Sequence, residues 1–587
     1  MKASDFVVRY LECRGVTHVF ELVGGMITHL LDSMGRETDI QIVSCHHEQG
    51  AAFAAEGHAR ISGVPGVALA TSGPGATNLV TSMGSCYFDS TPAVFITGQV
   101  NTYELRGERG IRQLGFQETD IMSMVVPITK WAVQVQAAAD LPQAIQRAFR
   151  EALEGRQGPC LIDLPMDVQS EVIDDAIAWG ALEQAQAEQG SSEDRSIPAG
   201  MEDQLLRLRQ AIASAERPLL LMGGGCAGYC NRAASRQVCE LLGIPTVLSL
   251  MGVDVLPDTD PLRVGFIGSY GNRWANKALG EADLLVVMGS RLDIRQTGSD
   301  LSSFCEGKQI WQIDIDSAEM GVRIKPDTAI CGSIQMAAAL LKATAPTPAA
   351  DTANCHQSWR DRIDTLRSLY PPEQEYRVEP QETNPVSLLK TLSLLSLNPC
   401  IYVTDVGQHQ MWAAQSLAFG AEDRFLTSGG MGAMGFGLPA AIGAALARPD
   451  LPVVLISGDG SFQLNIQELQ TVRRNDLNMK IILFNNNCHG MVRQFQESYF
   501  DGNVQSTVTG YSAPDFVAVG QAYGIPSSRL GPDANLPESL AALLAGVGPA
   551  LLEVPLSVRS KVYPKLAFGR RFGDMEPEAT PVAMEST

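Results

Sequence analysis

The chain has 587 residues, 45% of them hydrophobic, and carries a formal net charge of −21. This length predicts roughly three to four domains of about 150 residues, with apolar surface for several cores. The acidic net charge argues against nucleic-acid binding, which needs clustered Lys and Arg. Because no apolar run reaches about 18 residues, we expect no membrane span.

The N-terminal residues lack an apolar segment, so we expect no secretion signal. Twelve cysteines are scattered along the chain, and the closest pair, Cys226 and Cys230, has no histidine at ligand spacing. Free thiols are therefore favoured over a zinc site, and the protein is expected to be cytoplasmic.

Apolar runs of strand length recur, each followed by a Gly-rich turn and a helical pattern, as at residues 67–70, 218–222, 284–288 and 452–456. This alternation predicts an α/β fold with parallel sheets covered on both faces. Polar stretches at 183–201 and 344–384 separate three blocks. The expected units are three Rossmann-like domains at 1–182, 202–343 and 385–565, and a polar tail at 566–587.

A faint internal repeat relates the first and third blocks. Residues 67–75 and 453–460 each form an apolar strand followed by Ser-Gly-x-Gly or Ser-Gly-Asp-Gly and a helical pattern. The repeat predicts one fold for both blocks; the alternative is chance similarity between strand–turn–helix units.

In the first block, Glu48 follows an apolar strand at 40–43 and opens an Ala-rich helix. A buried carboxylic acid has a raised pKa and suits proton transfer, and a family resemblance given below implies that role for Glu48. The alternative is an ordinary glutamate that is stabilised at a helix N-terminus.

The middle block contains Gly223, Gly225 and Gly228 in a GxGxxG spacing after the strand at 219–222. Taken alone, the spacing predicts NAD binding. No acidic residue ends the next strand, at 244–248, where ribose recognition requires one, so a dehydrogenase is disfavoured.

In the third block, the turn Gly458-Asp459-Gly460 follows a buried strand, and Asn486 follows the next strand, at 480–484. Carboxylate and amide oxygens suit Mg²⁺, flanking glycines let a diphosphate approach, and the following helix offers N–H donors. Carboxyl ends of parallel strands are where such folds bind ligands, so we predict a metal–diphosphate site. The alternative is an Asp-Gly turn with an unrelated Asn-rich loop.

This pattern resembles the thiamine-diphosphate enzymes, whose motif begins with GDG and ends in NN. His46-His47-Glu48-Gln49-Gly50 resembles the catalytic-glutamate motif of the same enzymes. The resemblance implies that Mg²⁺ binds Asp459, Asn486 and the carbonyl of Cys488, and that Glu48 activates the aminopyrimidine. In that family the two blocks meet across subunits, which implies a homodimer or homotetramer.

Three further stretches, 406–409, 430–435 and 490–492, resemble coenzyme-contacting segments of that family. For Met434, expected between the two coenzyme rings, plain core packing is the alternative. The resemblance assigns to the coenzyme Gly407, Gln408, His409, Gly432, Met434, Gly458, Asp459, Gly460, Ser461, Asn486, Gly490, Met491 and Val492.

The resemblance covers nearly the whole chain and is closest to acetohydroxyacid (acetolactate) synthase catalytic subunits, as in Ser72-Gly-Pro-Gly-Ala-Thr-Asn-Leu79 and Phe116-Gln117-Glu118-Thr119. It implies decarboxylation of pyruvate and transfer of the two-carbon unit to a second carbonyl. Gln117 and Lys130 match positions along the substrate channel, although a solvated surface lysine is an equal alternative.

The same resemblance implies FAD, with a largely structural role, in the middle block. The matching positions are Gly223, Gly224, Gly225, Met251, Gly271, Arg291, Asp293, Arg295 and Asp314.

Two departures from the family bear on the acceptor. Phe495 stands where those synthases carry Trp, and Met26 replaces a small residue near the active-site mouth. The smaller ring of Phe495 favours a roomier or different acceptor pocket. Both departures resemble the flavin-containing side branch that adds the unit to a ketone or nucleotide keto-sugar (yersiniose type). The remaining alternatives are another thiamine-diphosphate 2-oxoacid decarboxylase and a sulfoacetaldehyde acetyltransferase.

Overall fold

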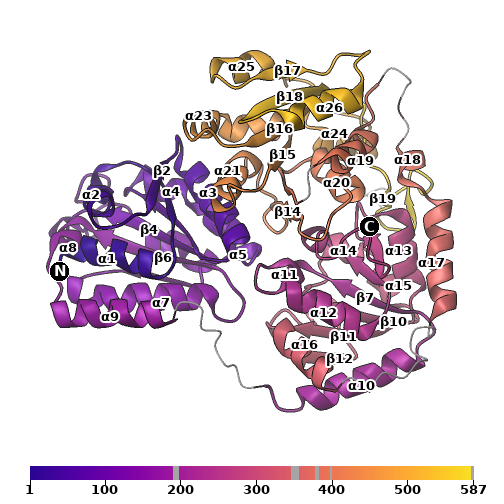
Figure 1. Ribbon diagram of the computed structural model, residues 1–587, viewed down its shortest axis with the longest axis horizontal. Coiled ribbons are helices and arrows are strands. Elements are labelled where there is room, and N and C mark those ends of the chain that lie inside the picture. The colour runs from indigo at the N-terminus through magenta and orange to yellow at the C-terminus, as the bar shows by residue number, and fades with distance from the viewer. Residues whose placement is uncertain (189–196, 345–355, 377, 379–381, 397–398, 583–587) are drawn as a thin grey trace.

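A computed structural model describes residues 1–188, 197–344, 356–376, 378, 382–396 and 399–582. Three six-stranded parallel sheets lie in three α/β units, and a two-stranded antiparallel pair follows near the C-terminus (Figure 1). The predicted α/β class with three parallel-sheet domains is therefore confirmed. Among the described residues, no helix combines the length and apolarity that a membrane span needs.

The first unit has the sheet order β2-β1-β3-β4-β6-β5. Its strands are β1 (His18–Leu22), β2 (Gln41–Ser44), β3 (Gly66–Ala70), β4 (Ala93–Gln99), β5 (Trp131–Gln134) and β6 (Pro159–Pro165). Its helices are α1 (Ala3–Cys13), η1 (Gly25–Ile27), α2 (Thr28–Glu37), α3 (Glu48–Ser62), α4 (Pro74–Asn78), α5 (Val80–Phe88), η2 (Thr102–Glu104), α6 (Ile121–Val125), η3 (Val126–Ile128), η4 (Ala138–Asp140), α7 (Leu141–Leu153), α8 (Met166–Ser170) and α9 (Asp175–Glu188).

The central unit has the order β12-β11-β10-β7-β8-β9, which is the doubly wound dinucleotide-binding arrangement. Its strands are β7 (Pro218–Met222), β8 (Thr246–Leu248), β9 (Arg263–Phe266), β10 (Leu284–Met288), β11 (Gln309–Asp314) and β12 (Thr328–Cys331). Its helices are α10 (Met201–Ser214), α11 (Gly224–Ala227), α12 (Arg232–Leu242), η5 (Leu250–Gly252), α13 (Arg273–Glu281), α14 (Ile294–Thr297), α15 (Leu301–Cys305), α16 (Ile334–Ala343), α17 (Gln357–Leu369) and α18 (Pro372–Glu375).

The third unit has the order β14-β13-β15-β16-β18-β17. Its strands are β13 (Ile401–Thr404), β14 (Arg424–Leu426), β15 (Val453–Gly458), β16 (Met479–Asn485), β17 (Ser527–Arg529) and β18 (Ala550–Pro555). Its helices are α19 (Pro385–Leu395), α20 (Gln408–Ser416), α21 (Gly437–Ala447), α22 (Asp459–Phe462), η7 (Gln463–Glu468), α23 (Leu469–Arg474), α24 (Gly490–Tyr499), α25 (Phe516–Ala522) and α26 (Leu536–Ala545).

The first and third sheets share one topology. Counting strands within each unit, both orders read 2-1-3-4-6-5, and the repeated segments form the equivalent third strands, β3 and β15. The predicted common fold of the two outer blocks is confirmed by this equivalence.

Part of the expected linker at 344–384 is instead helical. Within the expected linker 344–384, α17 places Trp359, Ile363 and Leu366 in the core of the central unit, because their spacing forms an apolar helical face. Residues 345–355, 377 and 379–381 of that linker, and 189–196 of the first one, lie outside the described residues.

The segment after residue 565 folds back rather than extending as a polar tail. β19 (Lys565–Leu566) pairs with β20 (Met575–Glu576). Arg273 of the central unit, which is buried, donates hydrogen bonds to the carbonyls of Met575 and Glu576. These contacts attach the C-terminal segment to the central unit at Met575 and Glu576.

The outer units meet along α3 and α21. A Cβ on Gly57 would lie 2.2 Å from the carbonyl oxygen of Ala440, and one on Gly443 would lie 1.9 Å from that of Ala54. Glycine at these positions therefore lets the two helices approach closely, and Phe53 and Phe436 add an edge-to-face ring contact at 5.5 Å.

Candidate active site

Glu48 lies at the carboxyl edge of the first sheet. It begins α3 four residues after β2 ends, and its side chain is buried. The amide of Asn78 donates to Oε2 of Glu48 at 2.9 Å, and a Cβ on Gly75 would lie 3.3 Å from Oε1. The turn 73–75 therefore brings the chain close to this carboxyl group.

Gln117 borders the same turn as Glu48. Its backbone is left-handed, with φ of 67°, and a Cβ on Gly73 would lie 3.1 Å from the Cβ of Gln117. The structure thus brings two of the predicted catalytic residues to one edge of the sheet.

Lys130 does not join them. It precedes β5, so it lies at the amino edge of the parallel sheet, where its backbone N–H donates to the carbonyl of Pro159. Its ammonium group donates to the carbonyls of Glu151 and Glu154 at the end of α7. This favours a helix-capping role for Lys130 over the proposed contact with substrate.

Asp459 and Asn486 lie together at the carboxyl edge of the third sheet. Gly458 of β15 is paired in register with Phe484 of β16, so the two predicted metal ligands follow adjacent strand ends. Both side chains are buried. Burial raises the pKa of Asp459 to about 6. The Tyr511 hydroxyl donates a hydrogen bond to Oδ2 of Asp459 at 2.9 Å, and this bond opposes the rise in pKa.

Asn486 is oriented by its neighbours. Its Nδ2 donates to Oε1 of Gln408 at 3.0 Å, and its Oδ1 accepts from the backbone N–H of Cys488 at 3.3 Å. Burial raises the pKa of the Cys488 thiol to about 11, so the sulfur stays protonated and only the carbonyl of Cys488 suits Mg²⁺.

Glycines beside the predicted ligands let histidine rings approach closely, and one of these rings carries a buried nitrogen that fits a metal-bound diphosphate. A Cβ on Gly458 would lie 2.8 Å from the ring of His409, and one on Gly460 would lie 2.7 Å from the ring of His489. Burial lowers the pKa of His409 to about 3, and its buried Nε2 has no hydrogen-bond partner among the described residues. A buried polar atom without a protein partner in the predicted phosphate loop fits a site that receives a phosphate oxygen.

The helix expected after the Asp459 turn is broken into α22, η7 and α23. Asn465 has non-helical backbone angles at the break, and Leu464 is 52% exposed. The Asn465 amide instead donates to the carbonyl of Gly435 at 2.7 Å and to Oε1 of Gln49 at 3.3 Å.

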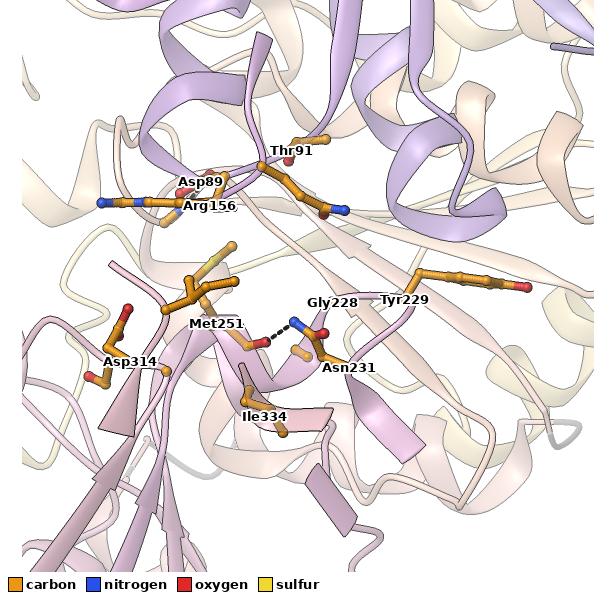
Figure 2. Close-up of a pocket in the computed structure, with 18 of the residues that line it drawn as sticks. Asp89, Thr91, Arg156, Gly228, Tyr229, Asn231, Met251, Asp314 and Ile334 are labelled. Carbon is orange, nitrogen blue, oxygen red and sulfur yellow. Dashed lines mark hydrogen bonds between the residues drawn. The ribbon is translucent and has the colours of Figure 1, made fainter. Parts of the chain in front are cut away.

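A cavity of about 1050 Å³ lies between the first and central units (Figure 2). The predicted flavin positions that line it are Gly224, Gly225, Met251, Arg291, Asp293, Arg295 and Asp314. Gly223 and Gly271 are not among its lining residues; a Cβ on either would lie less than 3 Å from neighbouring backbone, so they serve close packing.

Figure 2 shows that the first unit contributes Asp89, Thr91 and Arg156 to this cavity, opposite Met251 and Asp314 of the central unit. Sequence reasoning missed these three residues because they belong to a different block. The cavity also reaches Gly429 and Gly430, next to the predicted coenzyme loop.

Three family profiles match the chain: the thiamine pyrophosphate enzyme N-terminal TPP binding domain at 1–124, the central domain at 205–343 and the C-terminal TPP binding domain at 405–554. The chloroplastic acetolactate synthase of Arabidopsis thaliana is 38% identical over 584 residues, covering 98% of this chain and 84% of that protein. The acetolactate synthase isozyme 1 large subunit of Escherichia coli (strain K12) is 36% identical over 579 residues, covering 98% and 97%. The chain belongs to the acetolactate synthase family of thiamine pyrophosphate enzymes.

In this member of the acetolactate synthase family, the loop that carries Gly432 and Met434 is held by carboxylates that sequence reasoning missed. Asp405 is buried and accepts from the backbone N–H groups of Gly435 and Gly437, both at 2.9 Å. Asp89 accepts from those of Gly429 and Gly430 at 3.0 and 2.6 Å. The loop is therefore fixed at both ends by side chains from two different units.

The other residues that are predicted to contact the coenzyme also lie in the third unit. Gly407 precedes α20, Ser461 lies in α22, and Gly490, Met491 and Val492 open α24. A Cβ on Gly490 would lie 2.0 Å from Oε1 of Gln408, so glycine is required there for the Gln408–Asn486 contact.

Proposed function

We propose that the site formed by Asp459, Asn486 and the carbonyl of Cys488 binds Mg²⁺ and, through it, the diphosphate of thiamine diphosphate. The observation that carries this proposal is the adjacency of Asp459 and Asn486 at paired strand ends. When bound, the coenzyme supplies a nucleophilic carbon that attacks a 2-oxoacid carbonyl and accepts the electrons released by decarboxylation.

Glu48 is the acid of the proposed reaction. Its carboxyl group lies in a buried position and is hydrogen-bonded by Asn78, which fixes its orientation. It would hold a proton at the aminopyrimidine ring, while Gln117 borders the space beside it.

We further propose that Glu48 of one protomer and Asp459 of a second complete each site. Within one chain, Glu48 accepts from Asn78 of its own unit. Asp459 accepts from the Tyr511 hydroxyl and, through its backbone carbonyl, from the Gln463 amide, both in the third unit. Large apolar side chains at or beside the predicted site positions are exposed in the single chain: Phe116 is 79% exposed, Met431 41% and Val492 53%. A second copy would cover such a surface.

For the large cavity, we propose FAD. Its walls combine glycine turns at the end of β7 with Arg291, Arg295 and Arg156, which suit a dinucleotide diphosphate. Because the overall carboligation transfers no net electrons, the flavin would act mainly as a structural group.

The donor in this proposal is pyruvate, and the acceptor is a second pyruvate, a ketone or a nucleotide keto-sugar. Support for pyruvate comes from relatives named as acetolactate synthases. Support for a larger acceptor comes from Phe495, whose ring is 40% exposed and lies 4.8 Å from Tyr499.

The test is incubation of the protein with pyruvate, Mg²⁺ and thiamine diphosphate, with 2-oxobutyrate, simple ketones and nucleotide keto-sugars as added acceptors. Acetolactate or a tertiary alcohol is expected. Acetaldehyde as the sole product would point to a decarboxylase. In a separate incubation with sulfoacetaldehyde and inorganic phosphate, formation of acetyl phosphate with release of sulfite would point to an acetyltransferase. Absence of CO₂ release with every donor would overturn the proposal.

A further inference from the structure

Glu468 is a fully buried carboxylate that the proposed reaction does not use. It ends η7 in the third unit, yet its Oε1 accepts from the backbone N–H of His46 in the first unit at 2.9 Å. Its Oε2 accepts from the Thr471 hydroxyl at 2.6 Å. Both carboxylate oxygens are thus engaged, one of them by the loop that leads to Glu48.

The absence of a side chain at Gly50 leaves room for this contact of Glu468. A Cβ on Gly50 would lie 2.7 Å from Oε1 of Glu468, so glycine in the first turn of α3 is what lets the carboxylate reach His46. Burial raises the pKa of Glu468, and the hydrogen bonds from Thr471 and the His46 backbone oppose that shift. A buried carboxylate lowers the stability of the fold unless hydrogen-bond donors satisfy it. The His46 and Thr471 donors therefore stabilise Glu468 in this position.

Two further contacts connect the same segments. The Asn465 amide donates to the side chain of Gln49, and the Arg474 guanidinium donates to the carbonyl of Ser44. Residues 465–474 therefore contact residues 44–49 at three points, on both sides of Glu48 in sequence. Between β2 and α3 this loop is only three residues long, so its conformation sets where α3 begins.

We propose that Glu468 is a positioning residue that fixes the 44–49 loop and thereby holds Glu48 at the place its proton transfer requires. The proposal rests on the proposed function of Glu48. Asp459 begins the same helical segment, so within one chain residues 459–474 connect the metal loop to the loop of the catalytic acid. Misplacement of a reacting group by about 1 Å can cost about 100-fold in rate, which gives the expected scale.

The test compares Glu468→Gln with Glu468→Asp in the full-length protein. Gln keeps an oxygen that can accept from His46, whereas Asp keeps the charge but withdraws the oxygens by one methylene. Gln470→Ala, at an exposed position of α23, is the control. Two measurements are made: amide hydrogen exchange of the 44–50 peptide, and exchange of the thiamine C2 proton at saturating coenzyme and Mg²⁺.

In Glu468→Asp we expect faster amide exchange at 44–50 and C2-proton exchange slowed by about 100-fold, with the Gln variant within a few-fold of wild type. Loss in Glu468→Gln with Glu468→Asp near wild type would show that charge matters and would overturn positioning by reach. Equal loss in both variants would overturn it too, because an amide oxygen that still reaches His46 would then not be sufficient. Faster amide exchange with unchanged C2 exchange would also overturn it. Amide exchange reports the position of the 44–50 loop and does not depend on the chemistry of Glu48. If the proposed function of Glu48 is wrong, Glu48→Gln will show normal C2-proton exchange.

Discussion

The Nδ2 atom of Asn486 donates a hydrogen bond to Oε1 of Gln408 across 3.0 Å. Gln408 is itself oriented by donation from its Nε2 to the carbonyl of Ser560 at 2.8 Å. These contacts fix the orientation of the Asn486 amide, so that Oδ1 is the atom available to the proposed Mg²⁺. Groups that orient a ligand in this way contribute strongly to metal affinity.

We therefore predict that Gln408→Leu weakens metal binding by about 10- to 100-fold. The leucine retains similar volume but cannot accept from Asn486, so the amide is free to rotate. Mn²⁺ titration followed by electron paramagnetic resonance measures the change, with the exposed Gln521→Leu as control. Equal Mn²⁺ affinity in both variants would contradict the role of Gln408.

Glu48→Gln is expected to slow C2-proton exchange of bound thiamine diphosphate by orders of magnitude, because an amide cannot exchange a proton as a carboxylic acid does. Binding of the coenzyme with Mg²⁺ should stay close to wild type. Proton exchange is followed by NMR after quenching in D₂O, and Glu183→Gln on the exposed face of α9 serves as control. Unchanged exchange would remove Glu48 from its proposed role.

The purified protein is predicted to be yellow and to release flavin on denaturation. In Gly224→Leu the added side chain enters the cavity beside Met251, where even a Cβ would lie 2.9 Å from the methionine Cβ. We expect about tenfold or greater weakening of flavin binding, read from absorbance after denaturation. Gly228→Ala, whose Cβ would lie no closer than 3.4 Å to its neighbours, is the control; a colourless wild type would refute the assignment.

Asp405 is predicted to make stability depend on pH. Burial raises its pKa from 3.8 to about 6, while hydrogen bonds from the backbone of Val406, Gly437 and Gly435 oppose the shift. The folded protein therefore binds this proton more tightly than the unfolded chain. The resulting stabilisation is complete below about pH 4 and is lost as the pH rises through 6.

Two pKa units correspond to about 3 kcal/mol, so the free energy of unfolding of wild type relative to Asp405→Asn should fall by about that amount between pH 4 and pH 7. Paired urea titrations at each pH measure the difference. A difference that stays constant across this range would show that Asp405 keeps its ordinary pKa in the folded protein.

Contiguous residues were sufficient to predict the parts of the site that follow single strands. Asp459 and Asn486 each follow an apolar run, and Glu48 follows another, so the position of each at a carboxyl edge could be inferred from alternation alone. The α/β class and the common fold of the outer units followed from the same local patterns. Short-range backbone preferences and apolar periodicity determine these features, and both depend on residues that are close together in the sequence.

Tertiary structure alone decided which distant groups meet. The contacts of Glu468 with His46, and of Asp89 with Gly429, join residues separated by 422 and 340 positions. The place of Lys130 at the amino edge of the sheet follows from its position directly before β5. Its contacts with the carbonyls of Glu151 and Glu154, however, depend on how α7 packs beside that strand. Such contacts depend on how helices and sheets pack, and packing is a property of the whole folded chain that no local pattern contains.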